Sequence, residues 1–113
     1  MGYEEKRLFP RVSLRMPLRL NVRGKSEFYH ALSSDISRGG VSFVNESFLS
    51  LHTVVDLQIN MLSRIINPVG QVAWASAMPH SHRYRLGVQF QGLERQHVEF
   101  LRDFIDLKKD YLR

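Results

Sequence analysis

The sequence predicts an all-β fold, a small six-stranded antiparallel β-barrel with a C-terminal α-helix. Apolar residues alternate with polar residues in several short runs, and turn residues separate these runs about every ten positions. The apolar spacing changes to a helical period only after Gly92. Short strands, regular turns and one terminal helix are typical of a barrel that the helix covers. At 113 residues, the chain is long enough for one domain with a single core.

The first strand is expected to follow a flexible arm. Residues 1–11 lack an apolar period, are rich in charge and contain Pro10, so we divide the domain into this arm and a barrel of residues 12–113. Residues 12–23 alternate without exception between apolar and polar side chains, which predicts a half-buried strand with one basic face. Pro17 has no amide hydrogen and therefore predicts an open edge or a bulge at its position.

Five further strands complete the expected barrel. The second covers Glu27–Ser34, with Phe28 and Leu32 as its apolar positions, and Asp35–Gly40 follows as a loop. A segment at Phe48–Leu51 is expected to cross the core. The remaining strands are expected at 41–44, 55–59, 68–75 and 86–90, and the aromatic residues of the last two, Trp74 and Phe90, are expected in the core or the barrel wall.

The terminal helix is predicted by apolar residues at helical spacing. Glu94 near its start and two lysines near its end have the sense that the helix dipole favours. We expect the helix to pack over one end of the barrel, although an apolar stripe could instead serve a homodimer, so that monomer and dimer both stay open. The apolar residues of the predicted helix are Val98, Phe100, Leu101, Phe104, Ile105, Leu107 and Tyr111.

Charge is concentrated at the start of the chain. Residues 1–25 hold seven basic and two acidic side chains, which equals the whole net charge of +5, and the other 88 residues hold nine of each. Such a local excess indicates an anionic ligand or partner that binds at one place. The chain has no cysteine, which excludes disulfides, thiolate catalysis and cysteine-bound zinc. His80 and His82 have no evident third ligand, so we expect no metal site.

Two polar clusters carry the candidate chemistry. In the arm, three residues separate Arg7 from Arg11, and Lys6 adds a third cation. A guanidinium donates two parallel hydrogen bonds, which suits a phosphate or the O6 and N7 edge of guanine. A solvated basic tail is the alternative interpretation of this cluster.

The second cluster is Asp35–Gly40, which lies between two apolar strands. Asp35 and Ser37 form hydrogen bonds close to the backbone, and Arg38 adds a planar cation. The two glycines allow backbone angles or close approaches that a Cβ would block. Taken alone, the stretch also fits an ordinary turn.

Together, the two clusters resemble the PilZ domain, a bacterial receptor module for cyclic di-GMP. The family motif R-x-x-x-R falls on Arg7 and Arg11, and the motif D/N-x-S-x-x-G falls on Asp35, Ser37 and Gly40, which begins 24 residues after Arg11. Weaker family features are Val72-Ala73-Trp74 in a late predicted strand and Leu86-Gly87-Val88-Gln89-Phe90 in the last one. The terminal helix that follows is also typical of the family.

The resemblance implies that the arm crosses one face of the barrel and closes over the nucleotide. Arg7 and Arg11 would then meet guanine edges and phosphates, while Asp35, Ser37 and Gly40 hold the other side of the ligand. Gly40 would let the ligand or the arm approach the backbone.

Three further residues are candidate ligand contacts, namely Lys6, Arg38 and Gly39. In this family the residue before the first motif arginine is thought to influence whether one ligand molecule or an intercalated pair is bound. Lys6 keeps the charge of an arginine but lacks its stacking plane, so the stoichiometry stays open.

The functional prediction is a cytoplasmic second-messenger receptor with no catalytic activity and no cofactor. It would act through an unknown effector protein, and the resemblance points to motility, polysaccharide export or biofilm formation as its output. Neither a membrane nor a stable nucleic-acid partner is expected. The alternatives are a single-stranded nucleic-acid-binding barrel, and a PilZ-type adaptor that acts by protein contacts without ligand.

Overall fold

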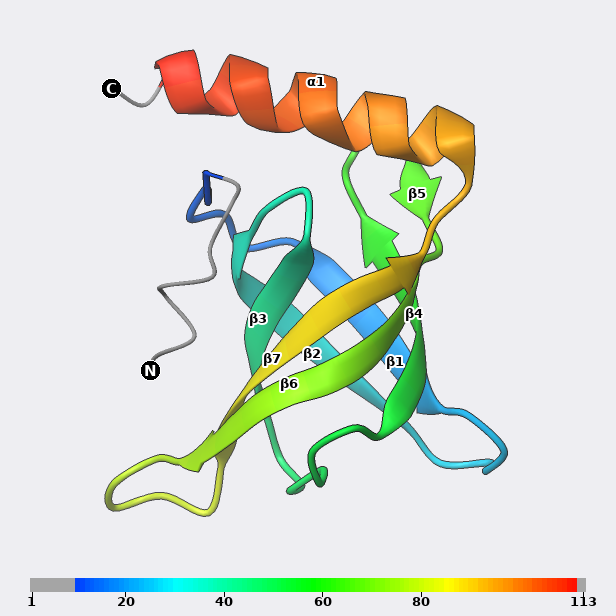
Figure 1. The fold of residues 1–113 in the computed structure, drawn as a ribbon. Helices are drawn as coiled ribbons and strands as arrows, with labels where there is room; N and C mark the ends of the chain where they lie inside the picture. Colours follow the sequence, from blue (N-terminus) through cyan, green and yellow to red (C-terminus); the bar gives the residue numbers. More distant parts are fainter. Residues whose placement is uncertain (1–9, 112–113) are drawn as a thin grey trace.

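The computed structural model describes residues 10–111, and the side chains of residues 10–108. These residues form a closed six-stranded antiparallel barrel with one short extra strand and a C-terminal helix, which confirms the predicted fold class (Figure 1). The strand order is β1-β2-β3-β7-β6-β4, β1 also pairs with β4 to close the barrel, and β5 adds to β4. The elements are β1 Pro17–Val22, β2 Phe28–Ile36, β3 Gly40–Asn45, β4 Val54–Asn60, β5 Ile65–Ile66, β6 Val69–Ala77, β7 Tyr84–Gly92 and α1 Arg95–Tyr111.

The core follows the predicted alternation in β1 and β4. Leu18, Leu20 and Val22 point inward from β1, and Val55, Leu57 and Ile59 do so from β4, so both strands bury every second side chain. Pro17 is the first residue of β1 and pairs only with β2, because pairing with β4 begins at Leu18. The open edge predicted at this proline is therefore present, on the β4 side.

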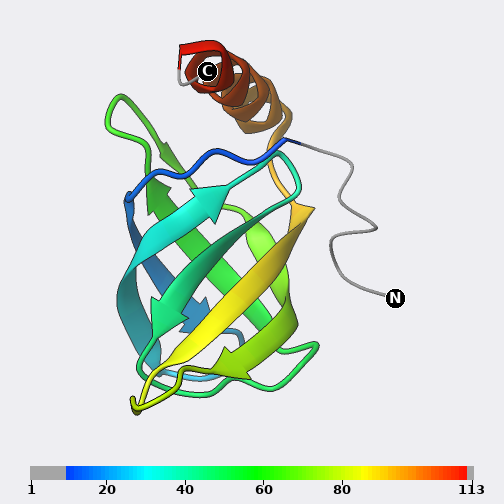
Figure 2. The same cartoon turned by 90° about the vertical axis from the view of Figure 1, so that its left-hand side faces the viewer.

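The first strand is shorter than predicted. Residues 12–16 run beside β2 without forming a regular strand, and Val12 makes one isolated bridge with Ile36 through two backbone hydrogen bonds of 2.9 Å. Ser33 fixes the rest of this segment, since its hydroxyl accepts from the Met16 amide at 2.8 Å and donates to the Leu14 carbonyl. Figure 2 shows the segment in blue, passing beside the end of β2 and below α1.

The apolar residues of the second strand do not mark its inward face. Phe28 and Leu32 are 46 % and 45 % exposed, whereas Tyr29, Ala31 and Ser33 are the positions that turn inward. The buried hydroxyl of Ser33 is satisfied by its two hydrogen bonds to the backbone. A polar residue can therefore occupy an inward position at which an apolar residue would be expected.

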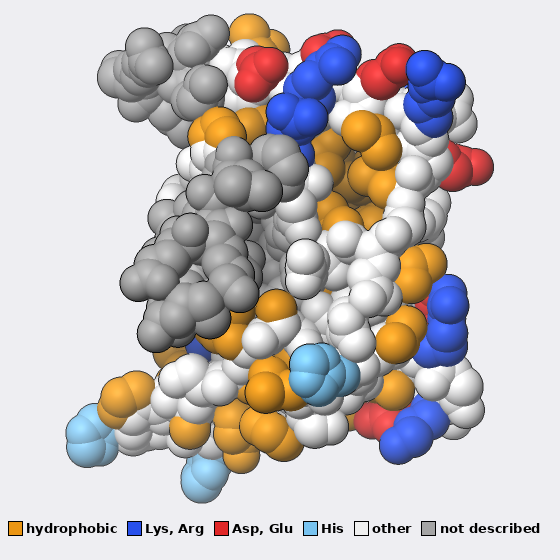
Figure 3. Space-filling model, viewed as in Figure 1, with side chains coloured by type: hydrophobic (Ala, Val, Ile, Leu, Met, Phe, Trp, Pro, Cys, Tyr) orange, Lys and Arg blue, Asp and Glu red, His pale blue; other side chains and the backbone are white. Residues whose placement is uncertain are grey.

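The helix lies across one end of the barrel, as predicted (Figures 1 and 2). Leu101 and Ile105, one turn apart, are fully buried, but Val98 and Leu107 are 42 % and 67 % exposed. The buried stripe is narrower than predicted, because Phe100 and Phe104 are only partly buried against the core and the other two residues lie outside the packed face. Apolar side chains reach the surface just below α1 (Figure 3). Among the described residues, no helix is long and apolar enough to cross a membrane.

Replacing Ser33 by alanine is expected to destabilise the fold by about 1–3 kcal/mol, because the buried Met16 amide would lose its acceptor. Urea unfolding followed by circular dichroism should show the lowered midpoint. Ser76→Ala, on an exposed part of β6, is the matched control. An unchanged midpoint for Ser33→Ala would show that these hydrogen bonds do not stabilise the segment.

Candidate functional site

Four residues from four neighbouring strands form a row on the outside of the barrel. Asp35 of β2 pairs with Ser42 of β3, Ser42 pairs with Gly87 of β7, and Gly87 pairs with Trp74 of β6. The flanking residues of β3 and β7 belong to the core, so this row faces outward. We refer to Asp35, Ser42, Gly87 and Trp74 as the outer row.

Two β-bulges place the ends of this row on the outside. The register shifts between Ser33 and Asp35 in β2, and again between Val72 and Trp74 in β6. Without a bulge, residues two apart in a strand share a face, so Asp35 and Trp74 would point into the core with Ser33 and Val72. The extra residue in each strand turns them outward instead.

Asp35 is held by partners from both sides. The Ser42 hydroxyl donates to Oδ1 of Asp35 at 2.9 Å, and Arg11 Nη1 lies 3.8 Å from Oδ2. The two charged side chains are 28 % and 23 % exposed, so the pair is partly shielded from water. The structure thus brings together Arg11 and Asp35, which are far apart in the sequence, because the Val12–Ile36 bridge holds the end of the arm beside β2.

The predicted Asp35–Gly40 loop is shorter in the structure. β2 continues to Ile36 and β3 starts at Gly40, so the turn contains only Ser37, Arg38 and Gly39. The prediction was wrong here because Ile36 and Val41 pair as strand residues.

Ser37 organises the turn. Its amide donates to the Gly40 carbonyl at 2.9 Å, and its hydroxyl accepts from the Gly39 amide at 3.1 Å. The Gly39 carbonyl accepts from the Phe90 amide at 2.8 Å, which fixes the turn to β7. Ser37 is 8 % exposed, whereas Arg38 is an exposed residue. Asp35 and this turn are therefore positioned by the barrel itself.

Gly40 has a structural reason to be glycine. A Cβ at this position would lie 2.3 Å from the Val88 carbonyl oxygen of β7. That distance is far below van der Waals contact, so β3 can pair with β7 in this way only if the residue at position 40 has no side chain. The close neighbour of Gly40 is thus the β7 backbone.

Trp74 and Ser42 were not among the predicted site residues. Trp74 does lie in the barrel wall, as predicted, but it is on the outer face and only partly buried. Its ring packs on Gly87, where an added Cβ would lie 2.1 Å from the indole Nε1. A glycine opposite a tryptophan is the one sequence signal that could have indicated this packing, but the bulge that turns Trp74 outward has no such signal. Phe90 is partly buried and packs against the core, as predicted.

Two predicted site residues, Lys6 and Arg7, lie outside the described residues, as does the arm up to residue 9. Within the described part of the chain, no three histidine or acidic side chains gather into a possible metal site.

Comparison with known proteins identifies a family and a fold. The family model described as "PilZ domain" matches residues 5–107. No sequence among the curated proteins gives a significant match.

Several solved structures have the same fold. The Bacillus subtilis inhibitor of motility MotI/DgrA superposes with a TM-score of 0.82 at 17 % identity, over 96 % of this chain and 53 % of its own. The PilZ domain of Escherichia coli YcgR with c-di-GMP gives 0.74 at 15 % identity, over 96 % and 95 %. The MrkH–c-di-GMP complex of K. pneumonia gives 0.74 at 18 % identity, over 96 % and 56 %. The chain therefore spans about half the length of MotI and of MrkH.

Proposed function

Because this chain belongs to the PilZ domain family, we propose that it is a receptor that binds cyclic di-GMP at the outer row and at the turn beside it. The observation that carries the proposal is the contact between Arg11 and Asp35, which joins the two family motifs at one place on the barrel. Two structures of similar fold were solved with c-di-GMP, which supports the same class of ligand here.

The chemistry of the site suits a guanine nucleotide. Asp35 is an acceptor and would take hydrogen bonds from guanine N1–H and N2–H, while Arg7 and Arg11 would donate to O6, N7 and phosphate oxygens. Trp74, which is partly buried at the end of the outer row, would add an aromatic ring on which a base can stack. Ser37 and Gly40 would act mainly by holding the turn, as their backbone contacts support.

Ligand binding would change the partners of Arg11 and Asp35. The carboxylate and the guanidinium are within 3.8 Å of each other, and each has polar atoms that a nucleotide could engage. Arg7, and in addition Lys6, Arg38 and Gly39, would close the site from the arm and the turn. We propose that this step orders the arm over the barrel and so changes the surface offered to an effector protein, without a catalytic step.

Calorimetric titration of the full chain with cyclic di-GMP tests the proposal. A saturable isotherm is expected, together with a change in fluorescence of Trp74, the only tryptophan in the chain. The absence of both heat and a saturable spectral change would overturn the proposed function.

Ser42→Ala should weaken cyclic di-GMP binding by about 5- to 10-fold, since Asp35 would lose the hydrogen bond that orients its carboxylate. The affinity is measured by calorimetry, with the exposed Ser76→Ala as the control. Unaltered affinity for Ser42→Ala would show that Asp35 does not need this partner.

A single-stranded nucleic acid remains the alternative ligand. The guanidinium of Arg19 lies 4.3 Å from the ring centroid of the exposed Phe28, so the outer face of β1 and β2 combines positive charge with an aromatic surface. Such a surface binds longer oligonucleotides more tightly, and its affinity falls steeply with salt. A closed dinucleotide site would show neither dependence as strongly, so an oligonucleotide-length series at two salt concentrations distinguishes the two ligands.

A further inference from the structure

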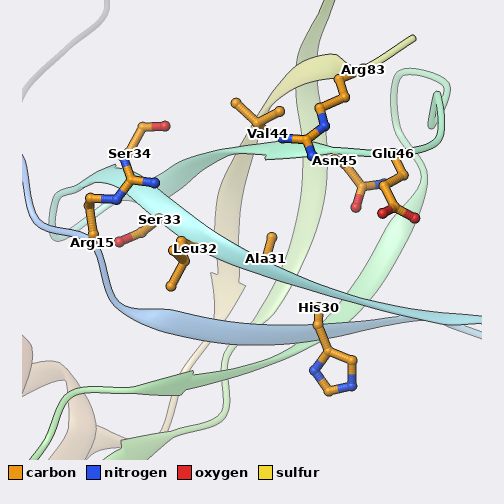
Figure 4. A pocket seen from close by; sticks show the side chains of 10 residues that line it. All are labelled: Arg15, His30, Ala31, Leu32, Ser33, Ser34, Val44, Asn45, Glu46 and Arg83. Carbon is orange, nitrogen blue, oxygen red and sulfur yellow. The ribbon is translucent and has the colours of Figure 1, made fainter.

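A pocket opens near the outer row, where β2 and β3 separate. Their pairing ends at Ser33 and Phe43, and beyond this point β2 continues along β1 while β3 continues along β7. The space between them is a pocket of about 230 Å³, which we call the wedge (Figure 4). Ser34, the residue before Asp35, lines the wedge, so the wedge begins one residue along β2 from the outer row.

The wedge offers hydrogen-bond donors at two separate places (Figure 4). Arg15 reaches it from the segment before β1, and Arg83 reaches it from the loop between β6 and β7 (Figure 4). Neither guanidinium pairs with a carboxylate among the residues that the structure describes. Two such groups at one pocket favour an anionic ligand, and their planar forks suit a phosphate.

The wedge also offers acceptors. Asn45 is 2 % exposed, and its Nδ2 donates to the Ser47 carbonyl at 3.0 Å, but its buried Oδ1 receives no hydrogen bond from any described residue. A buried carbonyl without a donor is costly, so this atom indicates a missing partner. The exposed Glu46 also lines the pocket, and Figure 4 shows its carboxylate beside the Asn45 side chain.

A ligand of the wedge must therefore carry both an anion and neighbouring N–H donors. Guanine has N1–H and N2–H side by side on one edge, which matches two adjacent acceptors, whereas the same edge of adenine has an acceptor beside its amino group. We propose that the wedge is a second guanine-nucleotide subsite, in which Arg15 and Arg83 bind phosphate oxygens from opposite ends of the pocket and Glu46 and Asn45 accept from the base.

This inference rests on the proposed function, because it assigns a further subsite to the same class of ligand. It also bears on the stoichiometry that Lys6 leaves open. A subsite in the wedge would admit a second molecule of cyclic di-GMP independently of the arm, or a single nucleotide such as GMP.

The test compares the full chain with the double variant Arg15→Ala/Arg83→Ala and with Glu46→Gln. Cyclic di-GMP and GMP are titrated separately, by calorimetry and by NMR of the Asn45 side-chain amide. For the wild type we expect two classes of cyclic di-GMP sites and a shift of the Asn45 signal with either nucleotide. The double variant should lose one class, and Glu46→Gln should weaken it about 10-fold. Arg19→Ala, on the same outer face but outside the wedge, is the control.

The outcomes separate this inference from the proposed function. Unchanged affinity and stoichiometry in the double variant would overturn the wedge subsite and leave the function intact. Binding of GMP that shifts the Asn45 signal, without any binding of cyclic di-GMP, would support the wedge and overturn the function. Failure of the wild type to bind either nucleotide would overturn both.

Discussion

Replacing Arg11 by alanine is expected to weaken cyclic di-GMP binding by about 30-fold or more. Removal of one partner from a charged contact that a bound ligand buries typically costs about 2 kcal/mol or more, which corresponds to that factor. Arg11 is the described residue that joins the arm to Asp35, so its loss removes a ligand donor and leaves the carboxylate without its cation. Arg7→Ala is expected to have the same effect. Calorimetry measures both affinities.

The same substitution should leave the unliganded fold almost unchanged. The Arg11–Asp35 pair is 3.8 Å apart and partly exposed, and such pairs contribute about 0–1 kcal/mol to stability. The thermal midpoint of Arg11→Ala should therefore stay close to that of the wild type. Arg19→Ala, which removes an equal charge on the outer face of β1, should retain both midpoint and affinity. A large loss of unliganded stability in Arg11→Ala would indicate a structural role for the arm instead.

The sequence was sufficient for the architecture because β1 and β4, the pair that closes the barrel, bury alternate residues. β1 and β4 have apolar side chains at every second position, and their predicted and observed inward faces are identical. The motif residues were also identifiable from the sequence. In the structure, Arg11 lies beside Asp35, and Ser37 lies in the turn that follows β2. Their roles in ligand binding stay predictions.

The remaining features of the site depend on pairing between distant strands. Ser42 is a polar residue among apolar neighbours, and only the β2–β3 register shows that its hydroxyl meets Asp35. Trp74 would share the inward face of Val72 in a regular strand, and only the bulge turns it outward. The wedge arises where two strands separate, for which periodicity gives no signal.

Gly40 distinguishes a structural from a ligand-binding reason for a motif glycine. We expect Gly40→Ala to destabilise the unliganded fold by about 3 kcal/mol, the upper end of the cost for inserting a methyl group into a packed site. The new Cβ would lie 2.3 Å from the Val88 carbonyl oxygen, and a backbone atom in a paired strand cannot move away cheaply. For a domain of this size, the thermal midpoint should fall by roughly 10 °C or more.

Gly92→Ala provides the matched control, since its Cβ would meet nothing closer than Val69 Cβ at 3.8 Å. That variant should melt within about 2 °C of the wild type, because the same methyl group enters free space. Gly40→Ala should also bind cyclic di-GMP less well, because the turn of Ser37–Gly39 is fixed through the same β3–β7 contact. If Gly40→Ala instead keeps its midpoint and loses only ligand affinity, Gly40 serves the approach of the ligand, and the steric argument from Val88 is wrong.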